Sequence, residues 1–251
     1  MLTRQTLVKN LVKSLEKKPY IVACWEGGSA ATGRLDEYSD LDLVTCAEEN
    51  STEKAMEDMS HVLSQLSEIE YSCRIPEPSW HGHSQCFFKI SGINENFFID
   101  FVVMSKNTSN KFTEPERHGK PVIYFDKSGF IDSKSANTNA FTDSKEKRFQ
   151  HLKSFFPFIK IAVTKELKRN KPLDALAFYR RSVDMLIEIM GMNYRPFRYD
   201  FGMRYLHKDF PADITKTLET LCYVAHPQQI KTNLEQIDKL FQNYVQKLEV
   251  H

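Results

Sequence analysis

The sequence predicts a mixed α/β sheet with flanking helices, followed by an all-α helical bundle. Up to about residue 125, short apolar runs of strand type are separated by polar turns. Beyond about residue 145, apolar residues instead recur at three- and four-residue spacing, which is the period of a helix. With 251 residues, 41% of them hydrophobic, the chain can bury a sizeable core. We expect an α/β domain over residues 1–132 and a helical bundle domain over residues 133–251.

The first part of the chain opens with a helical pattern over residues 3–15. A second helix is expected over Thr52–Leu66, where apolar residues recur at helical spacing after Ser51, a residue type that favours helix N-termini. Gly92–Glu95 is a turn signal that indicates a hairpin. The expected strands are Tyr20–Trp25, Leu41–Cys46, Glu68–Arg74, Ser84–Ser91, Asn96–Met104 and Val122–Phe125.

The middle of the chain, from Ser105 to about Lys145, is polar and irregular, and Ser133–Asn139 has the composition of a linker. After this segment the hydrophobic pattern is helical throughout. The expected helices are Phe149–Leu167, Pro172–Met190, Ile214–Val224 and Ile230–Leu248.

Composition excludes several classes of protein. No window approaches the roughly 20 unbroken apolar residues of a membrane span, and the N-terminal residues lack the apolar core of a signal peptide. The five cysteines form no Cys-x-x-Cys pair, so we expect free thiols and a cytoplasmic location. The residues after 142 are net basic, but no long Lys/Arg stripe alternates with aromatic residues, so nucleic acid is not an expected partner. A monomer or a homodimer fits equally well.

Residues 28–42 carry the strongest chemical signal. Gly28-Ser29 follows an apolar run, and a glycine there lets a phosphate approach the backbone. Asp40 and Asp42 stand at alternate positions beside the next apolar run, so both carboxylates point to one face of a strand. Like charges so close repel, and a divalent metal is the usual remedy. A turn position would also explain Asp40, but it would not explain Asp42, which lies inside the strand pattern.

A third carboxylate, Asp100, lies within the apolar run Phe97–Val103. Burying an unpaired charge is expensive, so Asp100 needs a partner. A salt bridge to an arginine such as Arg34 or Arg74 is the structural explanation. Together with Asp40 and Asp42 on a neighbouring strand, a metal site with three carboxylates is the functional one.

The order of these residues resembles the polymerase-beta-type nucleotidyltransferase superfamily. Ten residues separate Gly28-Ser29 from Asp40-x-Asp42, and a later carboxylate lies in an apolar strand. The sequence of residues 33–43 is similar to that of small bacterial members of this superfamily. Those include antibiotic nucleotidyltransferases that act on aminoglycosides or lincosamides, and they too carry a helical bundle after the catalytic domain. The motif covers roughly residues 20–104 and is more specific for the superfamily than for the substrate.

The resemblance implies a reaction and a set of roles. Asp40, Asp42 and Asp100 would hold two Mg²⁺ ions, and Asp100 would also be a possible base. Gly28 and Ser29 would hold the phosphates of a nucleoside triphosphate, expected to be ATP, with Arg34 as a further nucleotide-binding residue. A hydroxyl of a small-molecule acceptor would attack the α-phosphate in line, and pyrophosphate would leave.

Two further segments have open roles. Trp80-His81-Gly82-His83 contains alternating histidines that could bind a metal, although a loop beside the substrate cleft explains them as well. Arg180 and Arg181 could touch phosphate or form ordinary surface salt bridges. The aromatic and arginine-rich residues 194–206 could line a substrate pocket or pack against the bundle.

Two other functions compete with transfer to a small molecule. One is nucleotidylation of a protein or RNA partner. The other is a binding module that has kept the fold without catalysis. Clustered carboxylates argue against the second, because a bare scaffold gains nothing from like charges held together.

Overall fold

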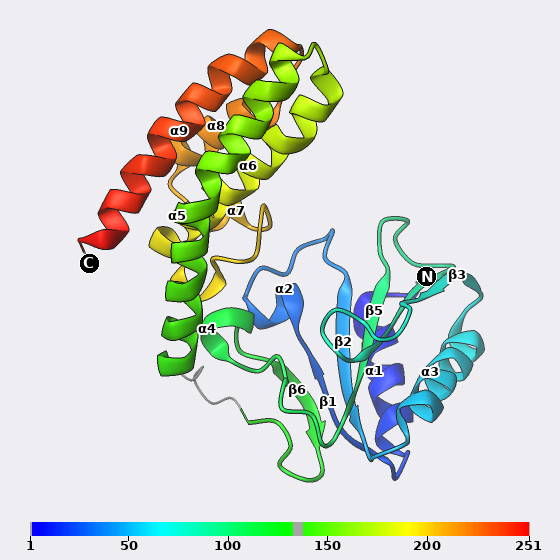
Figure 1. Ribbon diagram of the computed structural model, residues 1–251. Coiled ribbons are helices and arrows are strands. Elements are labelled where there is room, and N and C mark those ends of the chain that lie inside the picture. Colours follow the sequence, from blue (N-terminus) through cyan, green and yellow to red (C-terminus); the bar gives the residue numbers. More distant parts are fainter. Residues whose placement is uncertain (1, 133–137, 251) are drawn as a thin grey trace. The chain divides into compact units, whose positions relative to one another are not determined.

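The computed structural model describes residues 2–132 and 138–250, which form two compact units, Met1–Ala136 and Asn137–His251 (Figure 1). The expected domain boundary between residues 132 and 133, and most of the expected linker 133–139, lie outside the described residues. The mixed sheet and the helical region after it confirm the predicted fold class. In the described part of the chain, no helix is long and apolar enough to cross a membrane.

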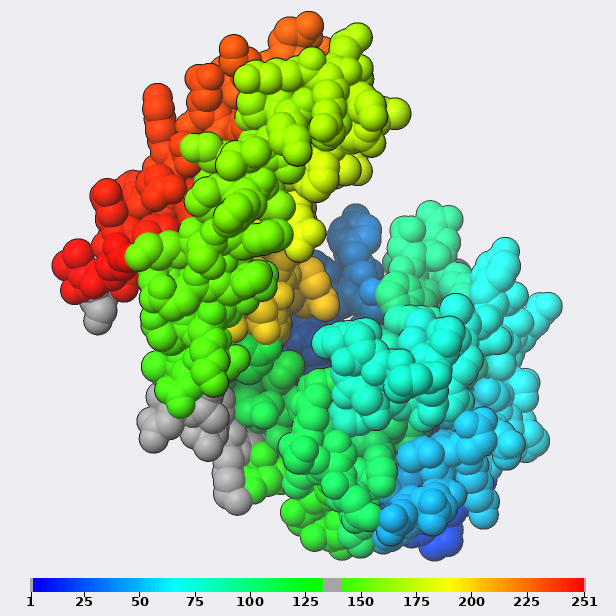
Figure 2. Space-filling view, viewed as in Figure 1, coloured from blue at the N-terminus to red at the C-terminus, as the bar shows by residue number. Residues whose placement is uncertain are grey.

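The first unit is built on a six-stranded sheet with the order β3-β4-β5-β2-β1-β6. Strands β2 and β5 are parallel at its centre, and every other neighbouring pair is antiparallel. The strands are β1 Ile21–Glu26, β2 Leu41–Ala47, β3 Ile69–Arg74, β4 Ser84–Ile90, β5 Ile99–Ser105 and β6 Val122–Asp126. The edge strand β3 is mostly exposed and contributes to the outer surface of this unit, cyan in Figure 2.

Two helices, α1 Arg4–Glu16 and α3 Thr52–Leu66, contact one face of the sheet and enclose its larger core. Alternation decides which strand residues join this core: Leu41 and Leu43 on β2 share the face of Ile99 and Phe101 on β5. The other face has a smaller core around Trp25, and it also carries the aspartates of β2 and β5. Two single-turn helices complete this unit, α2 Gly28–Ala31 and α4 Pro115–His118.

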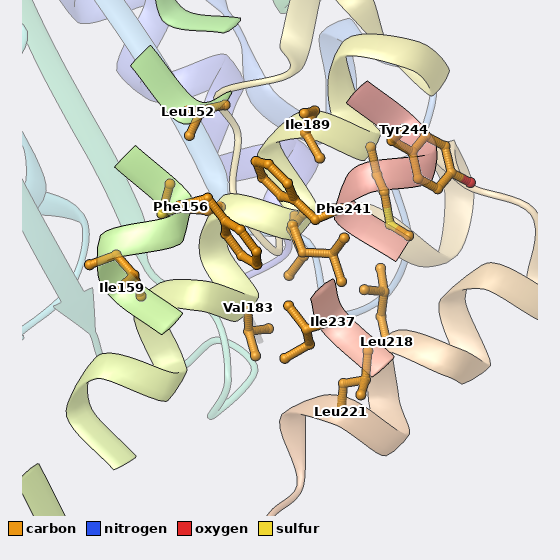
Figure 3. Packing of buried hydrophobic residues seen from close by; sticks show 14 of the residues in the cluster. Leu152, Phe156, Ile159, Val183, Ile189, Leu218, Leu221, Ile237, Phe241 and Tyr244 are labelled. Atoms are coloured by element: carbon orange, nitrogen blue, oxygen red, sulfur yellow. The ribbon is translucent and has the colours of Figure 1, made fainter. Parts of the chain in front are cut away.

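The second unit is entirely helical among its described residues. Its helices are α5 Thr138–Lys168, α6 Pro172–Tyr194, η1 Pro196–Arg198, α7 Leu206–Asp209, α8 Ala212–Cys222 and α9 Pro227–Glu249. At the centre of its core, shown in Figure 3, the rings of Phe156 on α5 and Phe241 on α9 stack with centroids 3.9 Å apart. Aromatic and aliphatic side chains at helical spacing therefore produce this unit, as the periodicity predicts.

Some expected boundaries were wrong. Helix α5 begins at Thr138, well before the expected Phe149, because a polar and charged start does not prevent a helix that packs along its later turns. The strand expected from Asn96 begins only at Ile99, so the connection between β4 and β5 is longer than the Gly92–Glu95 turn.

The arginine-rich segment 194–206 packs against its own unit. The Tyr194 hydroxyl lies 2.6 Å from that of Tyr244, and the buried Arg195 donates to the carbonyl oxygens of Gly202 and Arg204. These contacts favour the packing interpretation. Arg180 and Arg181 are exposed, and the Arg181 guanidinium lies over the ring of Phe155.

Candidate active site

The turn after β1 lies directly against the second aspartate of the motif. Gly28 adopts a positive φ of 52°, and a Cβ added there would lie only 1.7 Å from Oδ2 of Asp42. The backbone N–H of Gly27 donates to the carbonyl oxygen of Asp42 at 2.9 Å. Only glycine therefore fits at position 28, and its backbone and the Asp42 carboxylate share one small space. The buried hydroxyl of Ser29, next in the chain, has no hydrogen-bond partner among the described residues.

The parallel pairing of β2 and β5 sets two of the three aspartates side by side. Asp42 and Asp100 are register partners, and both are partly buried. Neighbouring strands lie about 4.8 Å apart, and paired residues project from the same face, so the two carboxylates come from adjacent points of the sheet. The expectation that Asp100 would lie on a strand next to Asp42 agrees with this pairing.

Asp40 precedes β2 and is held differently. Its Oδ1 accepts a hydrogen bond from the backbone N–H of Phe98 at 3.3 Å. Burial raises the pKa of the Asp40 carboxyl above its ordinary value, and the negative charge of Asp100 acts in the same direction, while the Phe98 N–H and the Arg4 guanidinium oppose them. A partly desolvated carboxyl near a second acidic group is the electrostatic setting that a bound cation relieves.

A buried ion pair supports the start of β2 from behind. Glu26, at the end of β1, is 2% exposed, and it accepts hydrogen bonds from the Arg4 guanidinium and the Tyr124 hydroxyl. Arg4 also donates to the backbone carbonyl oxygen of Asp40 at 3.2 Å. The pKa of Tyr124 is raised, by burial first and then by the bond to Glu26. Helix α1 is thereby tied to the segment that carries the predicted metal ligands.

The two arginines proposed as structural partners of Asp100 lie in different places. Arg74, on β3, donates to Glu53 and Glu77 on the unit's surface. Arg34 is partly buried in the loop between α2 and β2, where its backbone N–H donates to the carbonyl oxygen of Ser29 at 2.8 Å. Arg34 is thus attached to the Gly28-Ser29 turn through its main chain, and its nucleotide-binding role stays a prediction.

The histidine segment reaches the site through one residue that the sequence did not single out. Gln85 on β4 donates from Nε2 to Asp100 Oδ1 at 2.7 Å, and its Oε1 lies 3.1 Å from Nε2 of His81. His83 is buried, and burial together with the neighbouring His81 lowers the pKa of its imidazole. A polar residue in the alternating pattern of β4, four residues after a histidine, was the available signal for Gln85.

Two further observations concern metal-binding groups and cavities. Among residues 2–132 and 138–250, no three histidine, cysteine, aspartate or glutamate side chains form a group arranged to hold a metal ion, so the metal ligands stay a prediction. A cavity of about 500 Å³ opens elsewhere in the same unit. Its lining consists of Thr52, Glu77, Pro78, Ser79, Gly82, His83, Ser84, Val103 and Ser105, which include none of the predicted ligands.

The glycine turn and the paired aspartates on the sheet define a candidate phosphate-binding site. A comparison with protein families gives the class of protein to which such a site belongs. Residues 8–91 match the family described as "Nucleotidyltransferase domain". The match contains the Gly28-Ser29 turn, Asp40 and Asp42, and it ends before Asp100. It confirms the predicted resemblance to nucleotidyltransferases and, with it, an enzyme that catalyses nucleotidyl transfer.

Two solved structures are similar along most of their length. One is an aminoglycoside 6-adenyltransferase from Bacillus subtilis, at 12% identity and a TM-score of 0.39, covering 98% of this chain and 90% of that one. The other is spectinomycin adenyltransferase AAD(9) from Enterococcus faecialis with ATP and spectinomycin, at 12% identity and a TM-score of 0.34, covering 97% and 96%. Scores this low carry no conclusion about substrate. No curated protein sequence matches the chain.

Proposed function

We propose that the protein transfers AMP from ATP to a hydroxyl group of a small-molecule acceptor and releases pyrophosphate. The observation that carries the proposal is the register pair Asp42–Asp100, with the Gly28 backbone pressed against the Asp42 carboxylate. Carboxylates next to a glycine turn, where no Cβ blocks the backbone, are the groups needed to hold a metal-bound triphosphate. The choice of ATP and of a small acceptor comes from the resemblance to antibiotic nucleotidyltransferases.

The residues fit Mg²⁺ by their chemistry. Mg²⁺ prefers oxygen ligands, and it is commonly held by one or two carboxylates together with substrate phosphates rather than by a cage of protein groups alone. Asp42 and Asp100 supply an adjacent pair, and Asp40 lies two residues from Asp42. We assign Asp40, Asp42 and Asp100 as the ligands of two Mg²⁺ ions. When bound, the metal stabilises charge on the attacking and leaving oxygens.

The other residues of the site would bind and orient the nucleotide. The backbone at Gly28 and the unpartnered Ser29 hydroxyl would contact the terminal phosphates, with Arg34 nearby. An acceptor oxygen then forms a bond to the α-phosphorus, while the bond between that phosphorus and the bridging oxygen of pyrophosphate breaks. Asp100 would take the proton of the acceptor hydroxyl, directly or through one water.

We assign nucleotide binding and chemistry to the sheet unit, with the boundary near residue 132. The reducing cytoplasm is the proposed location, since all five cysteines are free, one of them exposed.

The test measures pyrophosphate release with Mg²⁺ and each of the four common nucleoside triphosphates, over a panel of hydroxyl-bearing small molecules that includes aminoglycosides. Asp42→Asn should lower transfer about 1,000-fold or more, because metal charge stabilisation contributes several kcal/mol. Glu37→Gln, an exposed carboxylate in the preceding loop, is the matched control and should act like the wild type.

Three results would contradict the proposal. Unchanged turnover of Asp42→Asn would remove the metal assignment. Transfer only to a copurifying protein or RNA would replace the small acceptor with a macromolecule. No pyrophosphate release with any nucleotide or any class of acceptor would favour a binding module without catalysis.

A further inference from the structure

A chain of hydrogen bonds runs from the loop before β4 to the carboxylate of Asp100. The backbone N–H of His83 donates to His81 Nδ1 at 3.1 Å, His81 Nε2 lies 3.1 Å from Gln85 Oε1, and Gln85 Nε2 donates to Asp100 Oδ1 at 2.7 Å. All three distances fall in the normal range for hydrogen bonds.

The direction of each bond is fixed by its neighbours. Because the Gln85 amide donates through its nitrogen to Asp100, its oxygen faces His81 and must accept. His81 therefore carries its proton on Nε2, and the bare Nδ1 accepts from the His83 N–H. One neutral tautomer of His81 satisfies all three hydrogen bonds. Each donor therefore points along this series of bonds toward the Asp100 carboxylate.

The sheet explains why Gln85 reaches Asp100. Gln85 pairs in register with Val102, and Asp100 lies two residues before Val102 on the same face of β5. Diagonal neighbours on one face of antiparallel strands are within reach of a long side chain. Gln85 and Asp100 are both partly buried, and shielding from water strengthens a hydrogen bond to a charged group.

We propose that Gln85, held by His81, is a positioning residue that fixes the Asp100 carboxylate for metal binding and proton acceptance. The inference deepens the proposed function and rests on it for the role of Asp100. An amide suits the task because it holds one oxygen of the carboxylate without bringing a positive charge that would compete with a cation. Partners that orient a metal ligand in this way commonly change metal affinity or activity 10- to 100-fold when removed.

The experiment replaces Gln85 with methionine, which keeps the length and loses both hydrogen bonds. Gln65→Met is the matched control, since Gln65 on α3 also pairs with a histidine, His61 at 2.9 Å, but is exposed and remote from the aspartates. Binding of Mn²⁺ alone is measured by electron paramagnetic resonance, and kcat and KM for ATP are measured separately.

For Gln85→Met we expect Mn²⁺ affinity and kcat to fall about 10-fold or more, with KM for ATP changed less than about 3-fold. His81→Phe should have a smaller effect of the same kind and add little to Gln85→Met, because both act through one chain of bonds. In ¹⁵N NMR spectra, His81 should show the Nε2–H tautomer in the wild type and in Gln65→Met, and lose it in Gln85→Met.

The outcomes separate the two proposals. A wild type that binds Mn²⁺ but transfers nothing, with weaker binding in Gln85→Met, would reject the proposed function and keep the positioning role. Wild-type Mn²⁺ affinity together with a wild-type kcat in Gln85→Met would overturn the positioning role and leave the proposed function intact. A wild type that neither binds Mn²⁺ nor transfers nucleotide would overturn both.

Discussion

The sheet unit and the helical unit differ in the settings of some of their buried polar groups. In the helical unit, the buried Arg195 meets backbone carbonyl oxygens and Asp209, and the buried Tyr179 hydroxyl meets Asn233 and a backbone carbonyl. In the sheet unit, Asp42 and Asp100 are register partners on parallel strands, and the charge of Asp100 adds to the burial that raises the pKa of the nearby Asp40 carboxyl. Complementary pairs occur in both units, since Glu26 of the sheet unit accepts from Arg4 and Tyr124, but the register pair of aspartates on parallel strands belongs to the sheet unit.

The pair of aspartates coincides with the proposed site. Like charges held close lower the stability of a fold unless donors or a cation compensate them, and Gln85 donates to Asp100 here. The ion pair of Glu26 and Arg4 is linked to this site, because Arg4 also donates to the backbone carbonyl oxygen of Asp40. Aromatic and aliphatic packing stabilises the helical unit, as it does the larger core of the sheet unit.

The largest expected effect tests the packing of the helical unit. Phe241→Ala removes half of the stacked pair with Phe156 in a fully buried position, and it should lower the free energy of unfolding by about 4 kcal/mol. Both tryptophans of the chain, Trp25 and Trp80, belong to the sheet unit. In urea, the circular dichroism transition should therefore shift more than the tryptophan fluorescence transition, and equal shifts would show that the units unfold together.

The next effect tests the buried charge of the sheet unit. Arg4→Met leaves Glu26 buried without its cation and should cost about 3 kcal/mol, seen by tryptophan fluorescence. Arg74→Met removes an arginine whose ion pairs to Glu53 and Glu77 are exposed, and it should cost less than about 1 kcal/mol. Equal costs for the two variants would mean that the Glu26 pair is no more than a surface contact.

Gly28→Ala tests the contact between the turn and Asp42. The added methyl group must displace the carboxylate, and a shift of that size should lower nucleotidyl transfer about 100-fold. Gly33→Ala is the control, since Gly33 also has a positive φ but its Cβ would meet no atom within 4 Å. Similar losses in both variants would point to backbone strain rather than to the carboxylate.

The smallest expected effect is a dependence of stability on pH, which comes from Asp126 at the end of β6. Burial alone would raise the pKa of Asp126, but hydrogen bonds from the backbone N–H groups of Ile131, Phe130 and Ser128 outweigh it and hold the pKa below its ordinary value. The folded state therefore binds a proton less readily than the unfolded chain, so Asp126 stabilises the fold above pH 4 and loses this contribution as the pH falls.

Asp126→Asn removes that titration. Its unfolding midpoint should fall less steeply than that of the wild type between pH 4 and pH 2, measured by urea titrations across that range. Parallel pH profiles for the two proteins would show that the hydrogen bonds to Asp126 do not depend on its charge.

Local pattern predicted much of the fold and part of the site. Alternation placed Asp42 inside a strand, and the cost of burying Asp100 pointed to a neighbouring one. The start of α5 and the role of Gln85 escaped prediction, because each depends on which segments pack together rather than on nearby residues. Glu26 offered a signal that was passed over: a charged residue at the end of an apolar run, with its partners 22 and 98 residues away.

The position of β6 has a consequence for synthesis of the chain. Strand β1 lies between β2 and β6, but β6 is made about a hundred residues after it. A nascent chain that has already paired β1 with β2 still exposes one side of β1, an open edge that can bind another chain. The Tyr124 hydroxyl reaches Glu26 only when that edge closes. On the ribosome, the first unit therefore stays vulnerable to aggregation until residues 122–126 have emerged from the exit tunnel.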